Sequence, residues 1–177
     1  MERIGIFCSA SDEIDTVYFE KASELGEWMG QNKKTLVYGG ANLGLMECIA
    51  KAAREKGGFV MGVVPTKLEE RGAVSDLLDV TFRVDNLSER KDVMLRESDI
   101  LVALPGGVGT LDEVFHVMAS ASIGYHAKKV ILYNIDGFWD GLLAFMEALK
   151  GKHFARRPWE NFCLVANDFK ELIELLK

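Results

Sequence analysis

The chain of 177 residues has few residues of the kinds that form disulfides, metal sites or flexible linkers. Its three cysteines, Cys8, Cys48 and Cys163, are widely spaced without a CxxC pair, and its three histidines share no metal-binding spacing. We therefore expect reduced thiols, no disulfide, no bound metal and a cytoplasmic location. Only three prolines are present and there is no low-complexity tract, so no flexible linker is predicted.

The chain also has fewer basic than acidic residues. Lysine and arginine number 21 against 27 aspartates and glutamates, which gives a formal net charge of −6 at pH 7. Such a chain lacks the basic surplus by which proteins bind nucleic acid or anionic lipid non-specifically, so we expect neither partner. No long apolar run predicts a signal peptide or a membrane-spanning segment. An anionic ligand must then be held locally, by backbone amides and a few well-placed cations.

Short apolar runs alternate with amphipathic stretches along the chain. Continuous apolar strands indicate a parallel sheet covered on both faces, and single helices between them indicate right-handed crossovers. We therefore predict an α/β fold, a doubly wound parallel sheet in a three-layer αβα domain over residues 1–177. The predicted strands cover 3–8, 35–38, 59–64, 80–84, 100–104, 129–135 and 162–165, and the predicted helices cover 16–31, 43–56, 88–97, 110–123, 138–149 and 168–177. Residues 65–79 are either a lid or a plain crossover with a short helix.

Ligands of doubly wound sheets bind outside the carboxyl ends of the strands, so the residues that follow each strand are candidates for a site. Ser9 follows the first predicted strand, and Gly39 and Gly40 follow the second. Two cations lie after the fourth strand, and a glycine-rich segment from Pro105 to Thr110 follows the fifth. Because these residues fall at one edge of the sheet, we predict that Ser9, Gly39 and Gly40 bind substrate there.

The glycine-rich segment is the sharpest motif in the chain. Its backbone amides, the threonine hydroxyl and the following helix N-terminus would form a phosphate cradle from Gly106, Gly107, Val108, Gly109 and Thr110. The segment lacks the Gly-Lys-Ser/Thr of a Walker A loop and the third glycine of a dinucleotide fingerprint, so a single phosphate fits better. A purely structural alternative is a capping box, with Thr110 as the N-cap and Glu113 at the third helical position.

Arg90 and Lys91 open a predicted helix, where cations oppose the helix macrodipole. This unfavourable placement indicates a function, or else an ordinary ion pair with a nearby acid such as Glu89 or Asp85. If the fourth and fifth strands end near each other, Arg90 faces Glu113 across the glycine-rich segment.

The helix predicted over 110–123 is apolar on two sides. One side is formed by Leu111, Val114, Phe115 and Met118, and the other by Val117 and Ala121. One side can pack on the sheet, and the other then needs a separate cover. A second copy of the chain is the simplest cover, so we predict a homodimer.

These segments together resemble the "lonely guy" family of cytokinin riboside 5′-monophosphate phosphoribohydrolases, whose members were often labelled possible lysine decarboxylases. The signature Pro-Gly-Gly-x-Gly-Thr-x-x-Glu is present as Pro105 to Glu113. Further blocks that resemble the family are Leu36 to Gly40, Gly44 to Met46, Glu89 to Lys91, and Asn134 to Gly137. The likeness runs almost from end to end of the chain.

The resemblance implies a Rossmann-like homodimer with its site near the subunit interface, and hydrolysis of the N-glycosidic bond of a purine nucleoside 5′-monophosphate. By position it implies that Arg90 and Glu113 are the catalytic pair. The phosphate and ribose of the substrate would be held by Lys91, Gly106, Gly107, Gly109 and Thr110. We expect neither a metal nor a cofactor. The lysine decarboxylase label has no physical support, because a pyridoxal phosphate enzyme needs a Schiff-base lysine and no lysine here is in such a setting.

The chain departs from the family pattern at positions that surround the base more than the phosphate. Family members commonly have a histidine where this chain has Ser88, a Thr-Trp-Ala-Gln block where it has Ala119 to Ser122, and a glutamate where it has Gly72. Two alternatives therefore stay open. One is a general AMP nucleosidase, which differs only in the base pocket. The other is a non-catalytic nucleotide or cofactor carrier, which would keep the phosphate cradle without needing both Arg90 and Glu113.

Overall fold

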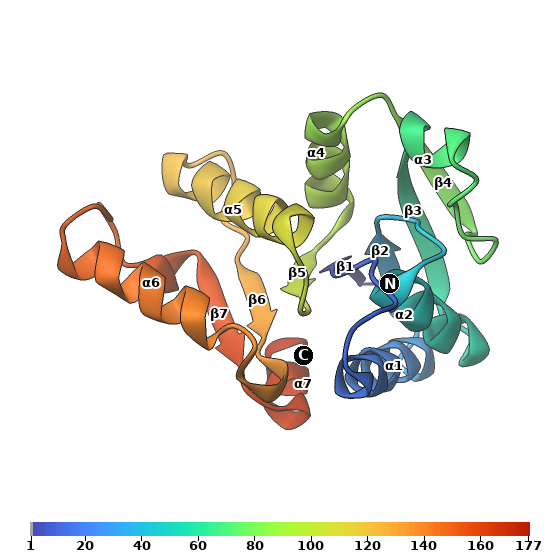
Figure 1. Cartoon of the computed structure of the whole chain (residues 1–177), viewed down its shortest axis with the longest axis horizontal. Helices are drawn as coiled ribbons and strands as arrows, with labels where there is room; N and C mark the ends of the chain where they lie inside the picture. Colours follow the sequence, from blue (N-terminus) through green and yellow to red (C-terminus); the bar gives the residue numbers. More distant parts are fainter. Residues whose placement is uncertain (1) are drawn as a thin grey trace.

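The computed structural model describes residues 2–177, and its strands form one parallel seven-stranded sheet (Figure 1). The order across the sheet is β4-β3-β2-β1-β5-β6-β7. The strands are β1 (Arg3–Phe7), β2 (Thr35–Tyr38), β3 (Phe59–Pro65), β4 (Val80–Val84), β5 (Ile100–Ala103), β6 (Val130–Tyr133) and β7 (Cys163–Ala166). The order reverses between β1 and β5, and this reversal is where doubly wound sheets open a crevice for ligands.

Helices cover both faces of this sheet, which confirms the predicted α/β doubly wound fold. One face is covered by α1 (Thr16–Gln31), α2 (Gly44–Glu55) and α7 (Phe169–Leu175). The other is covered by α4 (Leu87–Glu97), α5 (Val108–Ile123) and α6 (Asp140–Gly151). The short helix α3 (Thr66–Glu70) and two 3₁₀ turns, η1 (Ile135–Gly137) and η2 (Trp159–Asn161), complete the chain. No helix within residues 2–177 is both long and apolar enough to cross a membrane.

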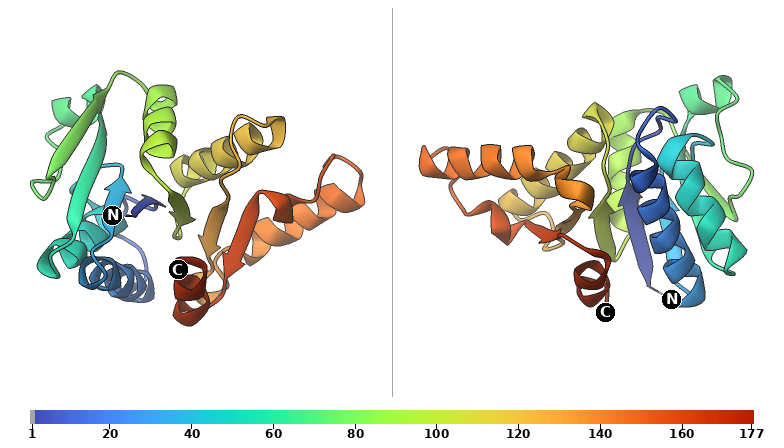
Figure 2. Two further views of the ribbon diagram at one scale, coloured as in Figure 1. Left: turned by 180° about the vertical axis from the view of Figure 1, so that it is seen from behind. Right: turned by 60° about the horizontal axis from the view of Figure 1, so that its bottom comes forward.

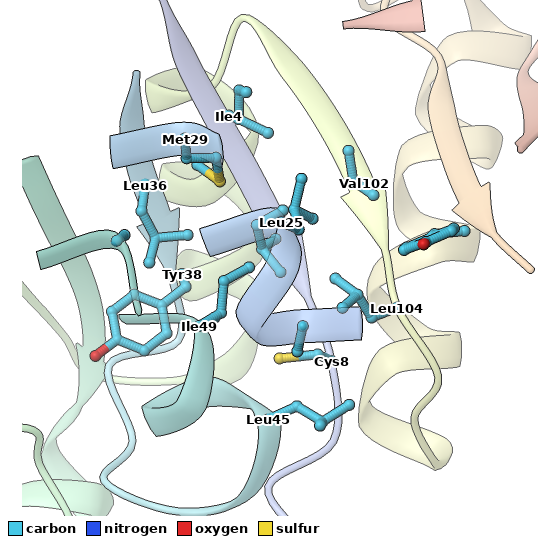
Figure 3. Close-up of a cluster of buried hydrophobic side chains, with 14 of the residues drawn as sticks. Ile4, Cys8, Leu25, Met29, Leu36, Tyr38, Leu45, Ile49, Val102 and Leu104 are labelled. Carbon is cyan, nitrogen blue, oxygen red and sulfur yellow. The ribbon is translucent and has the colours of Figure 1, made fainter. Parts of the chain in front are cut away.

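Apolar side chains fill both faces of the sheet because the central strands are apolar at nearly every position. Ile4, Leu36 and Val102 belong to a buried cluster that includes Leu25 of α1 and Ile49 of α2 (Figure 3). The alternate strand residues point to the opposite face and pack against α4, α5 and α6. Burying one such side chain contributes about 1.5–3 kcal/mol, so the two clusters fix the positions of the strand ends.

The strand order corrects one premise of the sequence-based expectation. The fourth and fifth strands do not end near each other, because β3, β2 and β1 lie between β4 and β5. Instead α4 crosses back from the edge strand β4 and packs against β3, β2 and β1, and against α5. This crossover, and not a neighbouring pair of strands, carries Arg90 to the middle of the sheet.

The predicted strands and helices are all present, with ends within two residues of those expected. The strand expected over 129–135 stops at Tyr133, because the Asn134 side chain accepts a hydrogen bond from the Trp139 amide at 2.7 Å and the chain turns there. Residues 65–79 form a crossover that contains the short helix α3. The crossover is tied to the glycine turn after β2, since the Ser75 amide donates to the Gly40 carbonyl at 2.8 Å.

Helix α5 uses its apolar residues differently from the expected division into two sides. Val114, Val117 and Met118 are all buried in the cluster beneath the helix, so the assignment of Val117 to a second side was wrong. Phe115 and Ile123 instead face outward, 39% and 75% exposed. The helix therefore still has an uncovered apolar side, formed by different residues.

Candidate active site

A cavity of about 300 Å³ lies at the carboxyl edge of the sheet, at the reversal between β1 and β5. It is lined by residues from four places in the chain: Cys8, Ser9, Ala10, Met46, Arg90, Gly107, Gly109, Thr110 and Glu113. Six predicted site residues therefore meet here: Ser9, Arg90, Gly107, Gly109, Thr110 and Glu113. No cluster of His, Cys, Asp or Glu side chains that could hold a metal ion occurs within residues 2–177.

The glycine-rich segment forms the first turn of α5 and not merely the loop before it. The helix begins at Val108, and its N-cap is Gly107, which makes no side-chain capping bond. The capping-box interpretation is therefore wrong: Thr110 lies inside the helix, and its side chain is buried. The first amides of a helix have no partners within it, so the helix start leaves backbone donors beside the cavity.

Gly106 makes room for the Thr110 hydroxyl. A Cβ added at Gly106 would lie 2.0 Å from Thr110 Oγ1 and 3.1 Å from the Ser9 amide nitrogen. A Cβ added at Gly107 or Gly109 would meet no atom within 4 Å, so a ligand can approach the backbone of these two residues directly. The Ser9 amide donates to the Pro105 carbonyl at 3.1 Å, and this bond joins the loops that follow β1 and β5.

Glu113 is buried one turn further along α5, with 7% of its surface exposed. Burial raises the pKa of this carboxyl to about 7, although the nearby Arg90 guanidinium acts in the opposite direction. Burial penalises the charged form, and this penalty exceeds the attraction of the cation. Glu113 is consequently poised to exchange a proton near neutral pH, as acid–base and charge-stabilising groups in active sites often are.

Arg90 enters the cavity from the first turns of α4 without a carboxylate partner. Its Nη2 donates to the Gly39 carbonyl at 2.7 Å and its Nε to the Val63 carbonyl at 3.1 Å. No Arg90 ion pair is present in the described residues, so the ion-pair interpretation does not hold for this cation. Burial lowers the pKa of Arg90, an effect that Glu113 partly offsets. A buried cation without a paired anion favours an anionic ligand in the cavity.

Lys91 does form the ordinary ion pair, although not with the expected acids. Its Nζ lies 2.8 Å from Asp112 Oδ1 at the start of α5, and the lysine does not line the cavity. Glu89 instead accepts a hydrogen bond from the Asp85 amide at 2.8 Å. Lys91 thus joins α4 to the N-terminal end of α5.

Besides Lys91, four predicted site residues lie outside the cavity lining: Gly106, Val108, Gly39 and Gly40. Val108 is 84% exposed. Gly40 adopts a positive φ of 74°, a turn that glycine makes without strain, and its added Cβ would meet Val64 at 2.6 Å. Gly39 lies behind Arg90. The structure does not bring these four residues into the cavity lining.

Cys8, Ala10 and Met46 line the cavity although they were not predicted as site residues. Cys8 (Figure 3) and Met46 also belong to the hydrophobic core. Both residues are therefore part of the core and of the cavity wall. Burial and the neighbouring Glu113 raise the pKa of the Cys8 thiol, which keeps it protonated and unsuited to act as a nucleophile. The available signal was the position of Cys8 at the carboxyl end of the predicted strand 3–8.

Known proteins have sequences related to this one over almost the whole chain. Residues 46–176 match the family described as "Possible lysine decarboxylase". A probable cytokinin riboside 5′-monophosphate phosphoribohydrolase of Oryza sativa subsp. japonica is 41% identical over 175 residues, 99% of this chain and 77% of the relative. A cytokinin riboside 5′-monophosphate phosphoribohydrolase of Arabidopsis thaliana is 34% identical over 176 residues, which cover 99% of this chain and 77% of the relative. The chain belongs to the lonely guy family.

Proteins with other names share the fold of this lonely guy family member. The molybdenum cofactor carrier protein of Chlamydomonas reinhardtii superposes with a TM-score of 0.76 at 25% identity, over 99% of this chain and 96% of that chain. A shared fold does not determine function, which depends on the groups in the site. The relevant groups here are the unpaired Arg90 and the buried Glu113.

Proposed function

We propose that the protein hydrolyses the N-glycosidic bond of a cytokinin-type purine nucleoside 5′-monophosphate and releases the free base and ribose 5-phosphate. One observation carries the proposal: Arg90 and Glu113 line the same small cavity as the glycine-rich start of α5. In the described residues Arg90 and Glu113 do not form an ion pair with each other, so the charge of neither group is neutralised in that way. The names of the family relatives support this substrate class.

The start of α5 would bind the 5′-phosphate through backbone amides and the Thr110 hydroxyl. Holding the phosphate there fixes the ribose beside Glu113, and this positioning contributes to the rate by removing translational and rotational freedom. Lys91 supports the arrangement through Asp112 at the same end of the helix.

Glu113 would act as a carboxylate during bond cleavage. As the C1′–N bond breaks, its electron pair leaves with the base and positive charge develops on the ribose, which the carboxylate stabilises. A water oxygen then bonds to C1′, one of its protons is released, and the departing base takes up a proton. Arg90 would stabilise the negative charge on the departing base or the phosphate.

The activity should be measured by incubating the protein with AMP and with N6-prenylated AMP and assaying free base and ribose 5-phosphate. Glu113→Gln and Arg90→Ala are each expected to lower kcat/KM by about 100-fold or more. The matched controls are Arg96→Ala, on the helix α4 that also carries Arg90, and Glu147→Gln on α6. Both side chains are exposed and lie outside the cavity, so both variants should keep full activity. Full activity in either site variant would contradict the assignment.

The outcome also separates the alternatives. Equal release from both nucleotides indicates a general AMP nucleosidase, and binding without release indicates a carrier. Because the carboxylate form is required, kcat/KM should rise with pH through about 7, the value to which burial raises the pKa of Glu113. A profile that is flat from pH 5 to 8 would contradict the proposed role of this carboxyl.

We further propose that the protein is a homodimer and is located in the cytoplasm. The uncovered side of α5, with Phe115 and Ile123, supports the dimer. Cys8, Cys48 and Cys163 are all unpaired, and this suits a reducing compartment.

A further inference from the structure

Gly39 lies against Arg90 but not in the cavity. Arg90 Nη2 donates to the Gly39 carbonyl at 2.7 Å and Nε to the Val63 carbonyl at 3.1 Å. The last paired residues of β2 and β3 are Tyr38 and Gly62, so Gly39 and Val63 are the first positions at which the two strands no longer pair. The guanidinium therefore occupies the point where β2 and β3 separate, and it donates to the carbonyl of the residue that follows β2 and to one carbonyl within β3.

The need for glycine at position 39 is steric. Gly40 has a positive φ of 74°, but Gly39 does not, so its backbone does not require a left-handed conformation. A Cβ added at Gly39 would lie 1.8 Å from Arg90 Nη2 and 2.9 Å from Cζ. Real Cβ atoms do not approach other atoms this closely, and thus any side chain at position 39 displaces the guanidinium.

The two carbonyls satisfy donors of Arg90 without cancelling its charge. A carboxylate in their place would form an ion pair and neutralise the cation. With neutral acceptors, Arg90 keeps its positive charge in the cavity and Glu113 stays free of a direct salt bridge. This separation leaves both groups available to a ligand.

We propose that Gly39 is a positioning residue, whose carbonyl and missing side chain hold the Arg90 guanidinium at the separating ends of β2 and β3. The inference rests on the proposed function and extends it to a residue that does not touch the substrate. It makes Gly39 necessary for the placement of Arg90 and not for contact with the nucleotide.

The test uses Gly39→Ala, Arg90→Ala and the double variant. Gly39→Ala is expected to lower kcat by about tenfold or more, since a displacement of about 1 Å at a catalytic group can cost that much. It should also change the pKa of Glu113, measured by ¹³C NMR titration of the carboxyl in the whole protein. In the Arg90→Ala background, Gly39→Ala should change that pKa no further, because the group that it displaces is gone.

Gly62→Ala is the matched control at the same end of the sheet. Its added Cβ would meet Leu78 Cδ1 at 2.6 Å and the Gly40 Cα at 3.3 Å, but not Arg90, so it should lower stability and leave the Glu113 pKa and kcat unchanged. Wild-type kcat and pKa in Gly39→Ala would overturn the inference, as would a pKa change that persists in the Arg90→Ala background. If the wild-type protein releases no base, the proposed function fails, while the titration still tests the placement of Arg90.

Discussion

Among single residues, Glu113 is the one whose burial has the clearest energetic consequence. Burial raises its pKa from an ordinary 4.5 to about 7, against the influence of Arg90. The folded protein therefore holds this proton more tightly than the unfolded chain does. For this reason the free energy of unfolding falls as the pH rises from 4.5 to about 7. Above about pH 7 the stabilising contribution of this proton is lost completely.

Glu113→Gln should consequently stabilise the protein at high pH. Glutamine imitates the neutral acid, so at pH 8 the variant avoids a cost of at most about 3.5 kcal/mol, at about 1.4 kcal/mol per pH unit between 4.5 and about 7. At pH 4.5 and below the two proteins should be equally stable. Urea unfolding at pH 4.5, 6 and 8 measures the difference, with Glu147→Gln as the exposed control. A stability difference that does not vary with pH would contradict the raised pKa.

The sequence predicts which residues gather at the site better than it predicts what each does there. Arg90, Glu113 and Thr110 could be assigned because they follow strands or occupy a family signature. The role of Gly39 could not, because its contact with Arg90 joins residues 51 positions apart and depends on the exact path of an arginine side chain. The ion pair of Lys91 with Asp112 could not be predicted either, because the two residues are 21 positions apart.

At the scale of elements, α4 determines where Arg90 lies. Its N-cap Asn86 accepts a hydrogen bond from the Glu89 amide at 2.9 Å, and Glu89 in turn accepts from the Asp85 amide at 2.8 Å. These bonds hold the first turn of the helix, directly before Arg90. Helix α7 has the same arrangement, with Asp168 as the N-cap and Glu171 bound to the Asn167 amide.

Asn86→Ala and Asp168→Ala form a matched pair. Each should lower stability by about 1 kcal/mol, the usual cost of removing a side-chain cap, which corresponds to about 2–4 °C in Tm for a chain of this size. Only Asn86→Ala should also lower kcat, because only α4 carries Arg90. If the whole loss of about 1 kcal/mol affected the position of Arg90 in the transition state, kcat would fall about fivefold, which is the upper limit. Thermal unfolding and the base-release assay are the two measurements. An equal effect of both substitutions on kcat would contradict a special role of α4.

The elements themselves were predictable because their physical signals are local. Continuous apolar runs identify buried parallel strands, and helical apolar spacing identifies the helices between them. The order of the strands is not a local property. For this reason the juxtaposition of Arg90 and Glu113 was predicted from neighbouring strands, whereas the crossover of α4 over three other strands produces it. The start of α5 was misplaced because a threonine before an acid resembles a cap, although Val108 and Gly109 already belong to the helix.

At the scale of the whole molecule, α5 and α6 leave apolar surface uncovered. Helix α6 extends away from the sheet in the right-hand view of Figure 2, and only Met146 of its residues is buried. Between the two helices lies a hollow of about 570 Å³ whose lining includes Phe115, Ile123 and Phe154, which are all exposed. Exposed apolar patches of this kind on a globular chain commonly mark protein interfaces.

The homodimer that we propose should therefore be held through α5. Light scattering after gel filtration should give about twice the chain mass of 19.7 kDa at micromolar concentration. Phe115→Glu or Ile123→Glu should convert the protein to monomer, because a charge at the interface core would be buried without a partner. Phe59→Glu is the matched control, since Phe59 at the start of β3 is 40% exposed against 39% for Phe115, and it should leave the mass unchanged. A monomeric mass for the wild-type chain would exclude the dimer and would leave the cavity around Arg90 and Glu113 to act within a single subunit.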